Sequence, residues 1–268
     1  MTDVPTPASS VPGRLGVAAR LDGDGSLRLV LTPTPPVLHH GIVRASVLSY
    51  VVDACAGISV DDDPDVWTLT TDMTVRMRPI AAPERVEATS RLVRRGRRSV
   101  TCTVELVDGD GASVASGAIG FAAVRRHPDD PPKPQVTPEE AVVLFDGVPV
   151  LSRPLRDEAA IEVVDAGEGI VEVEVRPDLR NPAGTLQGAM VALLAEVAAE
   201  ELVTDRFQVP AVVTDLDLRY LAQAPEGPVR TSARLLGDGP EAPIEVQLVD
   251  TSVGRLTTLV YARAQPVG

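Results

Sequence analysis

The chain has 268 residues, 44% of them hydrophobic, and a formal net charge of −13. This length allows one or two domains with packed cores, and the negative charge argues against binding to nucleic acid or to anionic membranes. No apolar run reaches the roughly 18 residues that a membrane-spanning helix needs, and the first residues lack a secretory signal. We therefore expect a cytoplasmic protein. Cys55 and Cys102 are isolated, so the sequence predicts neither a disulfide nor a metal site.

The first half reads as one strand, one apolar helix and four longer strands. Alternation of apolar and polar residues predicts a strand over 27–31, and an apolar run predicts a helix over about 42–58. Further strands are expected at about 66–78, 86–94, 99–107 and 113–124. The Asp-Gly-Asp-Gly segment at 108–111 is typical of a hairpin turn between the last two strands.

A proline-rich polar stretch at 128–136 predicts a semi-rigid linker, which would divide the chain into domains 1–127 and 137–268. Directly after it, Thr137, Pro138 and Glu140 have the spacing of a capping box at a helix N-terminus. A short helix to about residue 145 should follow.

The second half repeats the same order of elements. A strand is expected over 170–175 and an apolar helix over about 188–203, followed by strands at about 211–220, 229–236, 244–249 and 256–264. The repeat of about 145 residues is too long for a solenoid unit and indicates two similar domains in tandem. Consecutive antiparallel strands with one long buried helix in each half give the α+β class.

The apolar helix of the second half contains the pattern most relevant to chemistry. Glu196 is the only polar residue in the run 189–199, and Asn181, Gln187 and Gly188 precede the helix. A buried carboxyl group must be solvated by a cavity, be paired, or shift its pKa. A glycine at a helix start leaves backbone N–H groups that attract negative charge. The segment therefore predicts an oxyanion site and a catalytic acid, with half of a structural ion pair as the alternative for Glu196.

A related pattern precedes the helix of the first half. When His40 is aligned with Gln187, Gly41 falls on Gly188, Ser49 on Glu196 and Asp53 on Glu200. This alignment predicts that Gly41, like Gly188, begins a helix.

The spacing of Asn181, Gln187, Gly188 and Glu196 resembles that of hotdog-fold acyl-CoA thioesterases of the phenylacetic-acid-pathway and 4-hydroxybenzoyl-CoA type. The resemblance covers nearly the whole chain and implies a double hotdog, with two antiparallel sheets each wrapping a long central helix. It also implies hydrolysis of acyl-CoA to a free acid and CoA, and association of double units into homo-oligomers. The glycine amide would polarise the thioester, and the acid would act as base or nucleophile. CoA would enter only as part of the substrate, with no further cofactor.

Family dimers build each site from two hotdogs, so the resemblance implies two unequal composite sites. One would join Thr34, His40 and Gly41 to Glu196 and Glu200. We expect catalysis there, with Glu196→Ala removing most hydrolysis and leaving the fold intact, because the carboxyl group of Glu196 is in the family register.

The other composite site would join Asn181, Gln187 and Gly188 to Ser49 and Asp53, with Thr70 on the following strand. In this alignment Asp53 falls one turn late. A solvated or salt-bridged helix end is the alternative interpretation of both Asp53 and Glu200.

Four arginines, Arg94, Arg95, Arg97 and Arg98, fall on a predicted turn between strands. In an acidic chain they could bind the phosphates of CoA, since arginine forms bidentate contacts with such groups. A solvated hairpin tip is the alternative. Met73 and Met77 suggest an aliphatic acyl pocket, although the same residues would also suit an ordinary core.

Two other functions remain open at this point. One is a related hotdog enzyme, either an acyl-carrier-protein thioesterase or a dehydratase. The other is a non-catalytic acyl-CoA-binding protein, since the motif is incomplete in both halves.

Overall fold

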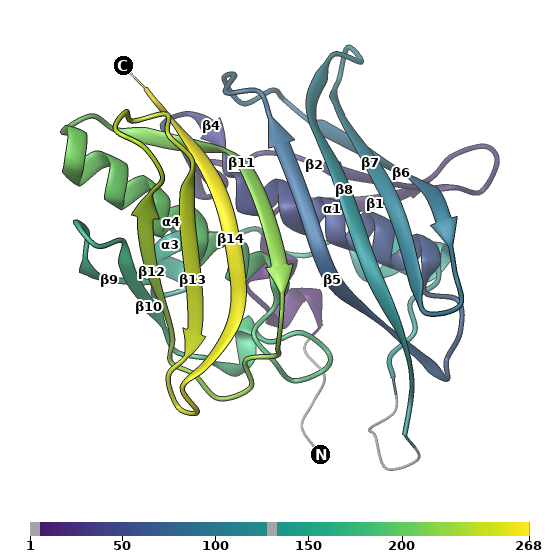
Figure 1. The fold of residues 1–268 in the computed structure, drawn as a ribbon. Coiled ribbons are helices and arrows are strands. Elements are labelled where there is room, and N and C mark those ends of the chain that lie inside the picture. Colours follow the sequence, from purple (N-terminus) through teal and green to yellow (C-terminus); the bar gives the residue numbers. More distant parts are fainter. Residues whose placement is uncertain (1–5, 128–132, 268) are drawn as a thin grey trace.

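The computed structural model describes residues 6–127 and 133–267, so residues 128–132 of the linker predicted at 128–136 lie outside the described residues. Its dominant feature is one antiparallel sheet of twelve strands in the order β1-β2-β6-β7-β8-β5-β11-β14-β13-β12-β10-β9 (Figure 1). The expectation of two separate sheets is wrong. Each half contributes six neighbouring strands, and β5 pairs with β11 from Asp72↔Arg219 to Arg76↔Asp215. This pairing buries two edges that would otherwise be exposed.

The strands of the two halves correspond closely. The first half contains β1 (Val17–Leu21), β2 (Leu27–Leu31), β5 (Val66–Met77), β6 (Val86–Arg95), β7 (Ser99–Asp108) and β8 (Ser113–Arg125). The second half contains β9 (Glu162–Asp165), β10 (Ile170–Val173), β11 (Ala211–Tyr220), β12 (Val229–Leu235), β13 (Ile244–Asp250) and β14 (Arg255–Pro266). The predicted strands are confirmed with small shifts at their ends, and the predicted hairpin turn joins β7 to β8. The outermost strands β1 and β9 were not predicted.

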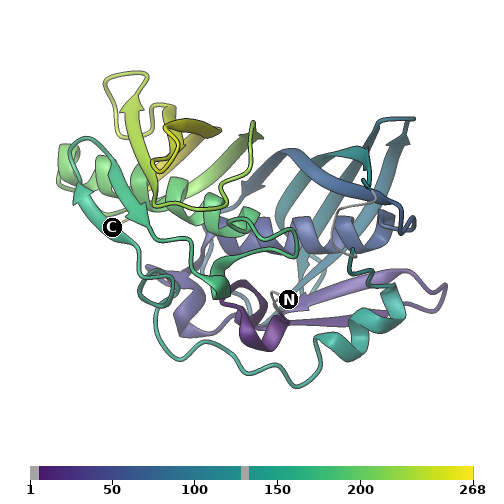
Figure 2. The ribbon, with the colours of Figure 1, turned by 90° about the horizontal axis from the view of Figure 1, so that it is seen from below.

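Two long helices lie against the concave face of the sheet (Figure 2). Helix α1 (Ala45–Val60) packs on strands of the first half, α4 (Gly188–Phe207) packs on strands of the second half, and the helices also contact each other. Most side chains of both helices are buried on every side, as expected for helices between a sheet and other elements. Buried Ser49 donates a hydrogen bond to the carbonyl of Ala45, which satisfies its hydroxyl within the helix.

Shorter segments join the two halves into one core. The predicted capping box at Thr137 begins α2 (Pro138–Leu144), which packs on β1 of the first half. In the opposite direction, the amide of Val11 donates to the carbonyl of Asp178, and Arg14 pairs with Glu158, the last residue of α3 (Leu155–Glu158). The boundary at 128–136 stays a prediction, as does association of the whole unit into homo-oligomers.

The predicted start of the first helix is wrong. Residues 38–43 form a small hairpin of β3 (Leu38–His39) and β4 (Ile42–Val43), whose turn residues His40 and Gly41 have φ values of 49° and 76°. Helix α1 therefore begins only at Ala45, and Gly41 is an exposed turn glycine. Aligning Ala45 with Gly188 places Asp53 on Glu196, and this alignment also keeps the spacing that relates Thr71 to Thr214. Asp53, and not Ser49, is the counterpart of Glu196.

Among the described residues, no helix combines the length and the apolar character that crossing a bilayer would require.

Candidate active site

A cavity of about 420 Å³ lies between the two halves. Its wall contains Asp53 from α1 and Thr70 from β5 on one side, and Asn181, Gln187 and Gly188 at the beginning of α4 on the other. These five residues are the predicted second composite site without Ser49. The volume falls within the range of about 300–1,000 Å³ that is usual for small-molecule sites.

Asp53 is one of two carboxyl groups that the first half contributes to the described cavity wall, the other being Asp61. The side chain of Asp53 is half-buried, and its Oδ1 accepts a hydrogen bond of 2.8 Å from the hydroxyl of Thr70. Burial raises the pKa of Asp53, while the hydrogen bond from Thr70 opposes that rise. A carboxyl group in this setting can act as a general base or a nucleophile when it is ionised. Because its pKa is raised, Asp53 ionises at a higher pH than an ordinary aspartate.

The N-terminus of α4 faces the same cavity. Gln187 is the N-cap residue, and its Oε1 accepts a hydrogen bond of 2.5 Å from the amide of Ala189. The amide of Gly188 has no acceptor within its own helix, as is general for the first residues of a helix. Together with the helix dipole, this amide makes the α4 N-terminus suited to a developing negative charge.

Asn181 organises the loop that leads into α4. Its Oδ1 accepts hydrogen bonds from the amide of Thr185 at 3.1 Å and from the Thr185 hydroxyl at 3.3 Å. The amide of Gly184 also donates to the carbonyl of Asn181, and Gly184 has a φ of 81°, which favours glycine. Asn181 therefore shapes the approach to Gln187 and Gly188.

Tyr220 is a cavity residue that was not predicted from the sequence. It ends β11, lines the cavity, and donates a hydrogen bond of 3.2 Å from its hydroxyl to the carbonyl of Gly188. Its position at the end of a strand in an aromatic-poor chain was the available signal. Trp67 and Phe121 also line the cavity, whereas buried Met73 and Met77 belong to the core. The suggested methionine-lined pocket is therefore wrong.

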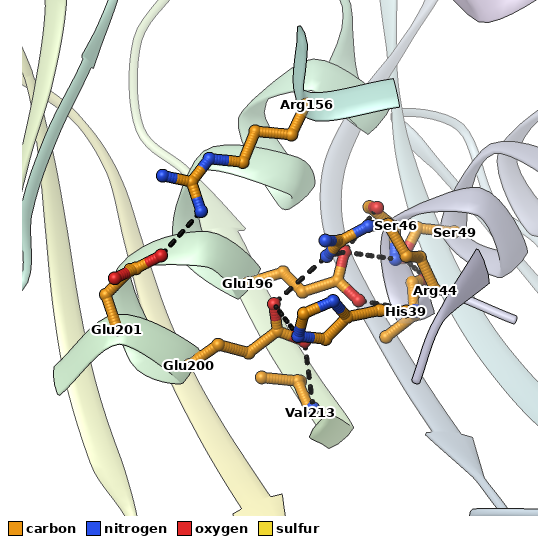
Figure 3. A network of polar contacts seen from close by, with 10 residues as sticks. His39, Arg44, Ser46, Ser49, Arg156, Glu196, Glu200, Glu201 and Val213 are labelled. Atoms are coloured by element: carbon orange, nitrogen blue, oxygen red, sulfur yellow. Dashed lines mark hydrogen bonds and ion pairs between the residues drawn. The ribbon is translucent and has the colours of Figure 1, made fainter. Parts of the chain in front are cut away.

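The expected first composite site is a closed ionic network, shown in Figure 3. The carboxylate of Glu196 accepts hydrogen bonds from the amides of Ala45 at 2.8 Å and Ser46 at 3.3 Å, and also from the Ser46 hydroxyl. Nη1 of Arg44 lies 3.0 Å from Oε2 of Glu200 and 3.6 Å from Oε2 of Glu196. The Glu196 carboxylate thus occupies the anion position at the α1 N-terminus.

Little of this network is exposed to solvent. Arg44, Glu196 and Glu200 have relative exposures of 6%, 1% and 4%, and the amide of Val213 donates to Oε1 of Glu200 at 3.4 Å. Burial raises the pKa of both glutamates, and Arg44 opposes this rise. His39, with its Nε2 3.4 Å from Oε2 of Glu200, has a pKa lowered to about 4, chiefly by burial and also by Arg44. His39 is therefore neutral at neutral pH.

The expectation that Gly41 and Glu196 share a crevice is therefore wrong. Gly41 and His40 lie on an exposed turn, and neither they nor Glu196 and Glu200 line the cavity described above. The physical reason is that the β3–β4 hairpin displaces the glycine from the helix start, and Arg44 then pairs with both glutamates. The ion-pair alternative describes Glu196 and Glu200 better than the catalytic one.

The arginine-rich turn joins β6 to β7 near the end of α1. Nη1 of Arg95 pairs with Asp62 at 3.1 Å and its Nη2 donates to the carbonyl of Val60, while Arg97 and Arg98 are exposed. Asp61, beside this contact, lines the cavity. The turn is thus attached next to the cavity wall. Among the described residues, no cluster of His, Cys, Asp and Glu is arranged to hold a metal ion.

Comparison with known proteins finds one match to a family profile and several solved structures of similar fold. Residues 55–115 match the sequence profile described as Thioesterase superfamily, and a search of curated proteins finds no match. A solved structure from Novosphingobium aromaticivorans, which carries a provisional thioesterase assignment, is similar over 94% of this chain and 99% of its own, with a TM-score of 0.64 and 17% identity.

Two further structures agree. A conserved hot dog fold protein of unknown function from Alicyclobacillus acidocaldarius has a TM-score of 0.61 at 14% identity, over 99% of each chain. An acyl-ACP thioesterase from Bacteroides thetaiotaomicron has a TM-score of 0.58 at 12% identity, over 89% of this chain and 97% of its own. The chain is a hotdog-fold protein. The predicted hotdog fold is confirmed, and the match to the Thioesterase superfamily profile is confined to residues 55–115.

The closed network makes a stability prediction. Glu196→Ala would leave Arg44 with one partner and two buried amides without an acceptor, so we expect a loss of about 3–5 kcal/mol in the free energy of unfolding. Urea denaturation measures this loss. Glu201→Ala is the matched control, because its partly exposed pair with Arg156 should contribute at most about 1 kcal/mol. A fully stable but inactive Glu196→Ala protein would restore the original catalytic assignment.

Proposed function

We propose that this hotdog protein hydrolyses acyl thioesters, with acyl-CoA as substrate, in the cavity between Asp53 and the α4 N-terminus. One observation carries the proposal: a carboxyl group with a raised pKa and a helix-start glycine amide, from opposite halves of the chain, line the same cavity. The superfamily match and the fold support the reaction class.

The proposed reaction follows from these two groups. Ionised Asp53 removes a proton from water as the water oxygen attacks the thioester carbonyl carbon, or it attacks that carbon directly and the resulting anhydride is then hydrolysed. In either route the carbonyl oxygen becomes negative and accepts a hydrogen bond from the Gly188 amide. The carbon–sulfur bond then breaks, and the thiolate takes up a proton to leave as CoA.

The remaining cavity residues would assist without reacting. Thr70 holds the Asp53 carboxylate, Gln187 caps α4, and Asn181 orders the loop before it. The arginine turn would bind the phosphates of CoA, since Arg97 and Arg98 are exposed and Arg95 attaches the turn beside the cavity wall. Such a local positive site matters in a chain with a net charge of −13.

Replacing Asp53 tests the proposal. Asp53→Asn should reduce thiol release from acyl-CoA by at least about 100-fold, because the base or nucleophile is lost. Stability should not fall. Because burial raises the folded-state pKa of Asp53, its stabilising contribution is present below the unfolded-state pKa and is lost as pH rises through the folded-state value. The amide of the variant does not ionise and avoids this loss, so Asp53→Asn should equal or exceed the wild type in thermal stability at pH 7.

Wild-type protein that is stabilised by acyl-CoA but releases no thiol would contradict hydrolysis and favour a binding protein. Faster release from acyl-ACP than from acyl-CoA would change the assigned carrier.

The hydroxyl of Thr70 should tune the pH dependence. Without its hydrogen bond, the ionised form of Asp53 loses stabilisation, so Thr70→Val should raise the pKa of Asp53 further. Activity requires the ionised form, so the acidic limb of the pH profile of kcat/KM should move to higher pH. Thr74→Val is the control, since Thr74 lies on the same strand but hydrogen-bonds to Asp217 outside the cavity. An unmoved acidic limb would separate Asp53 from the titrating group.

The arginine turn predicts a substrate-dependent effect. Reversing the charges of Arg97 and Arg98 should raise KM for acyl-CoA several-fold, because contacts with its phosphates would be lost. A pantetheine thioester of the same acyl group lacks the 3′-phosphate and pyrophosphate and serves as the matched substrate. Equal changes in KM for both substrates would exclude phosphate binding at this turn.

A further inference from the structure

Tyr220 links the sheet to the helix start that faces the cavity. Its hydroxyl donates a hydrogen bond of 3.2 Å to the carbonyl oxygen of Gly188, the first residue of α4. The same Gly188 carries the amide assigned above to the thioester oxygen. The carbonyl of Gly188 therefore contacts a residue at the end of a strand, while Gly188 itself lines the cavity together with Gln187.

Close packing accompanies this hydrogen bond. A Cβ atom on residue 188 would lie 3.2 Å from the Tyr220 hydroxyl oxygen and 3.6 Å from Cζ of the ring, which is tighter than ordinary contact for the first of these atoms. The Tyr220 side chain thus covers the face of Gly188 where a side chain would otherwise stand.

Glycine is the residue whose backbone rotates most freely, so a helix that begins with glycine gains little rigidity from that residue itself. The amide of Gly188 and its carbonyl belong to successive peptide groups, separated by the φ and ψ rotations of Gly188. A hydrogen bond to the carbonyl, together with a ring packed against the position that a Cβ atom would occupy, restrains the ψ rotation. The orientation of the first peptide groups of α4 then depends on Tyr220.

The hydroxyl of Tyr220 remains protonated over the pH range of an enzyme. Burial and the nearby Asp53 carboxyl group raise the pKa of Tyr220 well above its ordinary value. Since the neutral phenol is the form that donates a hydrogen bond, the contact with Gly188 persists while Asp53 titrates.

On the basis of the proposed hydrolase function, we infer that Tyr220 is a positioning residue, which holds the α4 N-terminus so that the Gly188 amide points at the thioester oxygen. A misdirected donor would stabilise the oxyanion less while leaving substrate binding by the rest of the cavity unchanged. The defect should therefore fall on kcat.

Tyr220→Phe removes the hydroxyl and keeps the ring. We expect kcat for acyl-CoA to fall by about tenfold or more, approaching the loss seen when an oxyanion donor is removed, and KM to stay within about twofold. The acidic limb of the pH profile should not move, because Asp53 keeps its contact with Thr70. Tyr261→Phe is the matched control, since Tyr261 is 41% exposed and its hydroxyl contacts Glu245 outside the cavity.

Gly188→Ala tests the same contact from the helix side. Its methyl group should displace the Tyr220 hydroxyl and lower kcat, and the double variant with Tyr220→Phe should be no slower than the slower single variant, because both changes break one contact. Additive losses in kcat would overturn the inference. In protein labelled with ¹⁵N-glycine, the Gly188 amide resonance should move in Tyr220→Phe and stay in place in Tyr261→Phe.

The outcomes distinguish failure of the positioning role of Tyr220 from failure of the proposed hydrolase function. Loss of kcat in Tyr220→Phe, with unchanged KM and unchanged thermal stability, supports the positioning role. Wild-type kcat in Tyr220→Phe, alongside an inactive Asp53→Asn, would remove that role and leave the hydrolase proposal standing. A wild-type protein that hydrolyses no thioester would remove both.

Discussion

The arrangement of the two halves depends on the buried guanidinium of Arg44, which lies between the carboxyl groups of Glu196 and Glu200. Glu196 also accepts hydrogen bonds from the amides of Ala45 and Ser46. These bonds fix the N-terminus of α1 to the middle of α4. Asp53 follows Ala45 by as many residues as Glu196 follows Gly188, which is about 12 Å of helix. Fixing one end of the antiparallel helix pair therefore brings Asp53 to the N-terminus of α4, where the cavity lies.

The closed network lies at the N-terminus of α1 and the cavity at the N-terminus of α4, so the two occupy equivalent places in the two similar halves. They differ because a few residues differ between the halves. Arg44 stands where the second half has Gln187, so one helix start has a cation that attracts glutamate and the other has a neutral amide cap. Glu196 reaches the opposite helix start, whereas Asp53, shorter by one methylene, is held by Thr70. The carboxylate of Glu196 is held by amides and a guanidinium and does not line the cavity. The half-buried Asp53 lines the cavity, where a substrate or a water molecule can reach it.

Much of this could be predicted from the sequence because it depends on local patterns. Alternation of apolar residues gave β2 and β11, and the helix from Gly188 followed from an apolar run after a glycine. Gly41 misled the alignment because a glycine before an apolar run suits a left-handed turn as well as a helix start. The sequence alignment therefore placed Asp53 on Glu200, whereas the structure places it on Glu196. The β5–β11 pairing, the pairing of Arg44 with both glutamates and the contact of Tyr220 with Gly188 join residues far apart in the chain, and no local pattern encodes them.

The composition of the cavity wall explains how such a space survives in a chain whose core is built from small aliphatic residues. The chain has one Trp, three Tyr and three Phe, and Trp67, Phe121 and Tyr220 all line the cavity. Six threonines, stiff at χ1 because they are β-branched, complete much of the wall: Thr68, Thr70, Thr71, Thr185, Thr257 and Thr258. Cavities in proteins shrink when their surroundings can relax into them. Rigid rings and β-branched side chains resist that relaxation, so Trp67, Phe121 and Tyr220 help to keep the site open.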